Sequence, residues 1–162
     1  MAWSASAIFR EFVTDALANA VAYDLSGTGV DTFKAALFNN SITPDKDASL
    51  TGYNEAAGQW LVANEVIDST GGGTDWPTGG VALTSPALTN PSSGVVMWDA
   101  NDTASGATAD ISGAFGTQIY DDTMTSPADA GICYLYFGGS NSVTNGTFTI
   151  VYNTNGLFRV TV

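Results

Sequence analysis

Short segments in which apolar and polar residues alternate constrain this sequence most. Successive side chains of a strand point to opposite faces, so alternation predicts a strand with one buried face. The clearest cases are residues 132–137, 147–152 and 157–162, and weaker ones are 31–38, 81–83, 95–99, 109–111 and 115–120. Eighteen glycines supply turns between them. Many short strands after a single helical pattern predict a mainly β fold, an antiparallel sandwich or barrel of the jelly-roll kind.

The sequence Asn153-Thr154-Asn155-Gly156 separates the last two alternating segments. Asn-Gly between alternating segments favours a tight hairpin, because both residues tolerate a positive φ. We therefore expect residues 147–152 and 157–162 to pair with each other. That register would bury Phe148, Ile150, Phe158 and Val160.

One segment has helical rather than alternating periodicity. Between residues 5 and 23 the apolar residues recur at spacings of one, three and four, which predicts an amphipathic helix. This divides the chain into an N-terminal helical segment, residues 1–28, and a single β-sandwich domain, residues 29–162. The apolar face could pack on the domain's own sheet, or it could dock on a neighbouring subunit. The candidate interface residues on it are Ile8, Phe9, Phe12, Val13 and Leu17.

The apolar face is long for a small sandwich to cover, and this favours the docking alternative. We accordingly expect that removing residues 1–23 leaves a folded β domain that no longer attaches to its partner.

Residues 71–80 form a loop by composition, with five glycines and one proline. The loop is the only candidate linker, but a boundary there would leave two halves with thin cores. We therefore predict one domain. Trp76 lies between Asp75 and Pro77 in this loop, which makes it a further candidate for exposure or for contact with a partner.

Charge and composition exclude several classes of function. Four basic residues face sixteen acidic ones, for a net charge of −12. Four scattered cations cannot neutralise a run of phosphates or hold an anionic membrane, so neither nucleic acid nor membrane is expected as a partner. No apolar stretch reaches the length of a membrane span, and the N-terminus does not have the pattern of a signal peptide.

The residue types also argue against an enzyme. There is no histidine, so histidine-centred triads and the common zinc sites are absent. Cys133 lies in an apolar segment and is expected to be a small buried side chain. The acidic stretches at residues 45–49 and 99–103 lack the pattern of a calcium loop, and the adjacent carboxylates Asp121 and Asp122 should point apart. We predict no catalytic, cofactor-binding or metal-binding residues and no cofactor.

Aromatic residues leave open a carbohydrate-binding alternative. Trp76, with Trp60, Trp98 or Tyr53, could form a platform on which sugar rings stack. Such residues in a β-sandwich otherwise belong to the core. This alternative requires that the indole rings reach the surface.

The order of several short motifs resembles that of a known family. Residues 33–47 are similar to a K-V-A-L-L-x-x-S-Y-T-P-D-x-D stretch in small virion proteins of tailed bacteriophages, and further similarities follow in the same order at residues 63–66, 79–83, 96–102, 142–150 and 155–158. The resemblance covers about residues 10–162. This chain departs from the family between Leu50 and Trp60, where it is longer than the family's sequences.

This resemblance implies a structural protein of the virion, most simply one that decorates or cements the outer surface of the capsid. Its expected partners are the major capsid protein and further copies of itself, after assembly in the host cytoplasm. A tail, collar or fibre-associated role is the alternative within the same family. High negative charge would keep free subunits soluble, and their mutual repulsion would make apolar and backbone contacts dominate assembly.

Overall fold

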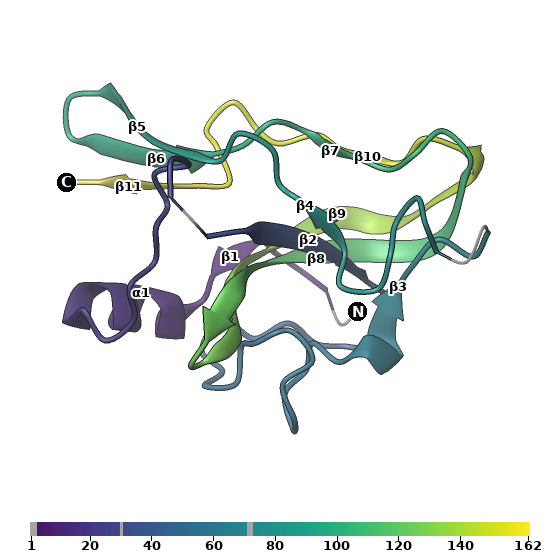
Figure 1. Ribbon diagram of the computed structural model, residues 1–162, viewed down its shortest axis with the longest axis horizontal. Coiled ribbons are helices and arrows are strands. Elements are labelled where there is room, and N and C mark those ends of the chain that lie inside the picture. The colour runs from purple at the N-terminus through teal and green to yellow at the C-terminus, as the bar shows by residue number, and fades with distance from the viewer. Residues whose placement is uncertain (1–2, 30, 71–72) are drawn as a thin grey trace.

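The computed structural model describes residues 3–29, 31–70 and 73–162, and it is mainly β with antiparallel sheets. Figure 1 shows a sandwich-like arrangement with a helix near the N-terminus. The larger layer is a six-stranded sheet of order β1-β9-β8-β2-β3, with β4 also paired to β2. The opposite layer contains a three-stranded sheet, β11-β6-β5, and a two-stranded ribbon, β10-β7. The described strands form no closed barrel.

The strands differ greatly in length. The larger layer contains β1 (Ala7–Ile8), β2 (Phe33–Phe38), β3 (Glu65–Val66), β4 (Val81–Ala82), β8 (Ala109–Thr125) and β9 (Ala128–Gly146). The smaller sheets contain β5 (Ala87–Ser92), β6 (Val95–Asp99), β7 (Thr103–Ala104), β10 (Thr149–Ile150) and β11 (Phe158–Thr161). The helix α1 spans Arg10–Ala18, and a 3-10 turn η1 spans Val62–Asn64.

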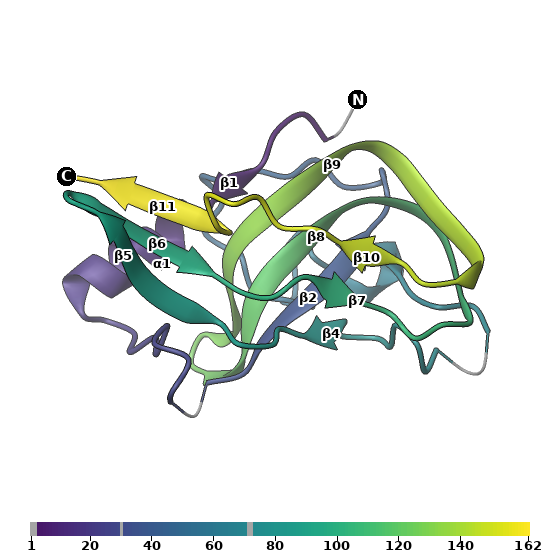
Figure 2. The ribbon, with the colours of Figure 1, turned by 90° about the horizontal axis from the view of Figure 1, so that it is seen from above.

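The hairpin of β8 and β9 forms the centre of the larger sheet. Both strands are far longer than the sequence suggested. The separate segments 109–111 and 115–120 join into β8 with several bulges, and the segment 132–137 is only the middle of β9. Bulges let a long antiparallel pair bend while it stays paired. Figure 2 shows the result, a strongly curved ribbon that passes beneath the small sheets.

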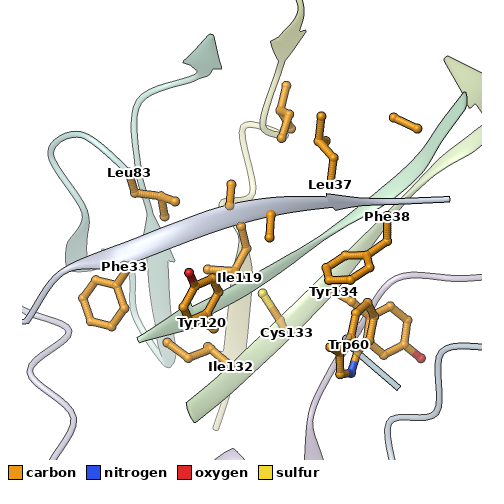
Figure 3. Packing of buried hydrophobic residues seen from close by; sticks show 14 of the residues in the cluster. Phe33, Leu37, Phe38, Trp60, Leu83, Ile119, Tyr120, Ile132, Cys133 and Tyr134 are labelled. Carbon is orange, nitrogen blue, oxygen red and sulfur yellow. The ribbon is translucent and has the colours of Figure 1, made fainter. Parts of the chain in front are cut away.

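Both faces of this sheet are buried. Alternation along β2 turns Phe33 toward Trp98 of the opposite layer, with ring centroids 5.0 Å apart. It turns Phe38 the other way, onto Trp60, at 5.1 Å. Figure 3 shows Leu37 and Phe38 on opposite sides of the strand, with Trp60 and Tyr134 grouped around Phe38. Residues 39–64 cover this second face (Figure 1), so the core has two halves with the sheet between them.

Residues 71–80 were predicted to be a loop, and the described part of them, residues 73–80, is one; residues 71 and 72 lie outside the described residues. The loop packs closely on the sheet at its end. Gly80 has a φ of +79°, and a Cβ there would lie 2.0 Å from the carbonyl oxygen of Ala35. The position therefore requires glycine, and the loop lies against β2.

The predicted helix over residues 5–23 is wrong in extent. Residues 7 and 8 form β1, which pairs antiparallel with Tyr134 and Cys133 of β9. Phe9 is extended, with φ −71° and ψ 134°, and its N–H donates to the carbonyl oxygen of Ile132 at 3.0 Å. The helix then ends at Asn19, whose left-handed conformation closes its last turn. Apolar spacing alone did not distinguish an edge strand followed by a short helix from one longer helix.

The N-terminal segment shares the core of the β domain. Trp3 and Phe9 are buried, and both lie edge-on to Trp60 at 5.8 and 5.6 Å between centroids. These contacts argue against the expectation that removing residues 1–23 leaves a folded β domain. Their loss would expose the aromatic cluster on one face of the sheet and strip β1 from β9.

The predicted C-terminal hairpin is also wrong. The turn exists: Gly156, with φ +80°, donates its N–H to the carbonyl oxygen of Asn153 at 2.8 Å. The strands on either side do not pair with each other, because β10 pairs with β7 and β11 pairs with β6. Phe148 and Ile150 are buried as expected, whereas Phe158 is partly buried and Val160 is 48% exposed. A turn sets the local direction of the chain, but packing selects the partner strand.

The position of the N-terminal aromatics predicts a contrast between two substitutions. Phe9→Ala removes a fully buried ring and should lower the free energy of unfolding by about 3–5 kcal/mol. Leu17→Ala, on the exposed side of α1, should change it by less than about 0.5 kcal/mol. Urea unfolding followed by tryptophan fluorescence measures both. Equal, small effects would show that the N-terminal segment does not contribute to the core.

Candidate partner-binding surface

The candidate interface residues separate into buried and exposed groups. Ile8 is partly buried in β1, and Phe9 and Phe12 are buried in the core. Val13 and Leu17 remain on the surface of α1, 40% and 84% exposed. Phe9 and Phe12 are therefore not available to a partner, because the protein's own aromatic residues cover them, and this part of the apolar face follows the alternative of packing on the protein's own core.

Phe12 attaches the helix to the rest of the molecule. Its ring lies 4.9 Å from that of Tyr23 and 5.8 Å from that of Phe158 in β11, both edge-on. At the start of the helix, the N–H of Arg10 donates to the carbonyl oxygen of Lys46, and its guanidinium donates to the carbonyl oxygen of Asp47 at 2.7 Å. Contacts on two sides hold α1 in a fixed position at the end of the sandwich.

The exposed pair Val13 and Leu17 therefore sits on a rigid support. The two residues are four apart, so they occupy the same stripe of the helix. Leu17 is the more exposed of the two. Exposed apolar side chains of a fixed helix can dock on a partner without the entropy cost of ordering a loop.

A hollow of about 250 Å³ lies beside this helix. The carboxylates of Glu11, Asp15 and Glu55 line it together with the rings of Phe12 and Tyr23. Burial and the charges of Asp15, Asp121 and Glu11 raise the pKa of Tyr23 to about 12, so its hydroxyl keeps its proton at neutral pH. The sequence did not indicate this acidic hollow, because its three carboxylates come from α1 and from a distant loop.

Trp76, a candidate for exposure or partner contact, is fully buried and therefore does not reach the surface. Its ring lies edge-on to Phe148 at 5.9 Å. Two carboxylates hold the surrounding loop in place. Asp68 accepts from the N–H groups of Thr70 and Asp110, and Asp75 accepts from the N–H and hydroxyl of Thr108. These backbone hydrogen bonds hold the pKa of Asp68 below its usual range.

The aromatic residues of the predicted carbohydrate platform are also buried or packed against other side chains. Trp60, Trp76 and Trp98 are each fully buried. Tyr53 is stacked on Tyr120 at 4.7 Å, and its hydroxyl donates to Glu65 at 2.7 Å. The indole rings that were to stack on sugars lie in the core, so this alternative is not carried further.

Cys133 is buried as predicted, and burial raises the pKa of its thiol to about 12. In the described ranges, no three side chains of His, Cys, Asp or Glu gather as a metal site would require. None of the described helices is long and apolar enough to cross a membrane.

Asp121 and Asp122 lie in different surroundings, as their adjacency on a strand suggested. Asp122 pairs with Lys34 at 2.8 Å. Asp121 is buried, and its Oδ1 accepts from the N–H of Thr123, while its Oδ2 has no hydrogen-bond partner in the described part of the chain. Burial, reinforced by the charge of Asp31, raises the pKa of Asp121 to about 6.

Comparison with protein-family models, with curated proteins and with solved structures found no match. The bacteriophage resemblance thus rests on the order of the sequence motifs alone.

The buried carboxyl of Asp121 predicts a pH dependence of stability. Its pKa is raised in the folded state, so folding favours the protonated form, and this contribution is lost as pH rises from about 4 to about 6. Asp121→Asn should stabilise the protein at pH 7.5 by about 1–2 kcal/mol and flatten the dependence of Tm on pH. Thermal unfolding of both proteins from pH 4 to pH 8 measures this change in stability.

In the same experiment, Glu11→Gln removes one negative charge from the acidic hollow and leaves Asp121 in place, so it serves as the control for the change in net charge. A Tm profile of Asp121→Asn that keeps the slope of the wild-type protein would contradict this assignment.

Proposed function

We propose that this protein is a structural component of a tailed-bacteriophage virion that decorates or cements the outer surface of the capsid. The order of motifs along residues 10–162 motivates the virion assignment. The single structural observation that supports it is the fixed helix α1 with Leu17 84% exposed on its surface. In this proposal, α1 attaches the protein to the major capsid protein.

The side chains that anchor α1 and those that would bind the capsid are separate. Phe12 packs against Tyr23 and Phe158, which leaves Val13 and Leu17 free to be buried by the capsid. Burying an exposed leucine side chain contributes about 1.5–3 kcal/mol. Many copies on a repeating lattice would multiply a contact of this size.

The charge of the protein shapes how this attachment would depend on salt. A net charge of −12 makes neighbouring copies repel one another. Salt screens that repulsion and leaves apolar contacts largely intact. We therefore expect occupancy of the lattice to rise with ionic strength, the opposite of binding driven by opposite charges.

The attachment helix can be tested with a matched pair of variants. Leu17→Ser together with Val13→Ser should weaken co-sedimentation with capsids that lack the protein by about tenfold or more. Leu88→Ser removes another exposed leucine, 46% exposed on β5 at the opposite layer, and should bind as the wild-type protein does. Circular dichroism checks that every variant is folded.

If the double variant binds capsids as tightly as the control, α1 is not the attachment site. The position of the protein in the virion, on the head or on the tail, tests the rest of the proposal. Quantitative mass spectrometry of purified virions and of tail-less heads should find hundreds of copies on both. A few copies per virion that are absent from tail-less heads would instead support the tail, collar or fibre alternative.

A further inference from the structure

The two layers of the sandwich separate from each other along one side, between β9 and β10. Two adjoining hollows of about 290 and 210 Å³ lie there and share Tyr136, Phe137, Ile150 and Val151 as lining. Figure 2 shows β9 curving past β10 at this side. The hollows together form a groove along β10, which we call the β10 groove.

Among the described residues, β10 pairs only with β7, which leaves its edge on the side of this groove unpaired. The N–H of Ser105 donates to the carbonyl oxygen of Phe148, and Ile150 pairs with Thr103 of β7. In an antiparallel pair, every second residue turns its N–H and C=O toward the partner strand. Thr149 and Val151 therefore turn theirs away from β7, toward the groove.

This edge lacks the features that usually prevent strands from pairing between molecules. Proteins protect sheet edges with charges, prolines or a covering segment. The outer strand β5 contains Pro91, and β11 contains Arg159. Residues 147–152 contain neither a charge nor a proline, and Val151 is 73% exposed.

Charge indicates what can approach the edge. Every residue that lines the β10 groove is uncharged, although the protein carries sixteen acidic residues. When two copies meet at this groove, its lining places no carboxylate of one copy against a carboxylate of the other. The lining of the groove therefore adds no charge repulsion of its own to a contact between copies.

We propose that a second copy of this chain pairs with the free edge of β10, antiparallel and across a two-fold axis at Ile150. Thr149 of each copy then faces Val151 of the other, which forms four backbone hydrogen bonds between N–H and C=O groups. The edge is self-complementary, as a two-fold interface requires. The contact joins the β10-β7 ribbons of two molecules into one continuous sheet.

The paired strands are short, so the dimer is weak, with a Kd on the order of 0.1–1 mM. This inference does not depend on α1 or on the capsid proposal, because it uses a different side of the molecule. Copies held at high local concentration would pair even though dilute protein is monomeric.

Sedimentation velocity over a wide range of protein concentrations tests the pairing. The wild-type protein should dimerise at high concentration, and added salt should strengthen the dimer. Val151→Asp places a carboxylate beside the two-fold axis and should abolish it. Leu17→Asp adds the same charge on α1 and should dimerise as the wild-type protein does.

Two further measurements separate backbone pairing from a general loss of structure. Val151→Pro removes the N–H that donates across the axis and should also abolish the dimer, with the Tm measured as a check on folding. Amide exchange followed by NMR should show protection of Thr149 and Val151 that increases with concentration. The proposal fails if the protein stays monomeric throughout, if Val151→Asp dimerises as Leu17→Asp does, or if the protected amides lie elsewhere.

Discussion

The antiparallel pairing of β8 with β9 is the contact on which the rest of the structure depends. It supports β2 on one side and β1 on the other, and its side chains contribute to both halves of the core. Tyr134 in β9 packs against Phe9 and Trp60 on one face, while Ile119 and Cys133 pair across the two strands. Trp3, Phe9 and Trp60 all pack against Tyr134, so this hairpin also positions the N-terminal segment and the loop that contains Trp60.

Local sequence pattern identified most strands, but the one pairing that it predicted, between residues 147–152 and 157–162, was wrong. Segments 31–38 and 95–99 were located closely, because each is a short, largely apolar segment that contains large side chains suited to a strand. The predictions failed where one sequence pattern was compatible with two different structures. Residues 5–23 satisfied a helical period, yet the pairing of Ala7 and Ile8 with β9 and the burial of Phe9 outweighed it. That outcome depends on residues more than 120 positions away, which no local window contains.

The same reasoning explains what could be predicted about the candidate surface. Val13 and Leu17 were identified from their spacing alone and are exposed, but Phe12 has the same spacing and is buried. The difference arises from Tyr23 and Phe158, whose rings close over one side of the helix. Trp76 was misjudged for a related reason: its glycine-rich surroundings suggested a loose loop, whereas Asp68 and Asp75 bind that loop through backbone N–H groups.

The pairing of β1 with β9 also sets the order in which the molecule can fold. Ala7 pairs with Tyr134, so the first strand of the chain cannot find its place until the ribosome has released most of the sequence. Until then Trp3 and Phe9 have no core to enter. Contacts between such distant parts of a chain slow folding, because a long loop must close before they form. Trp3 and Phe9 therefore remain open to non-native contacts until β9 is in place.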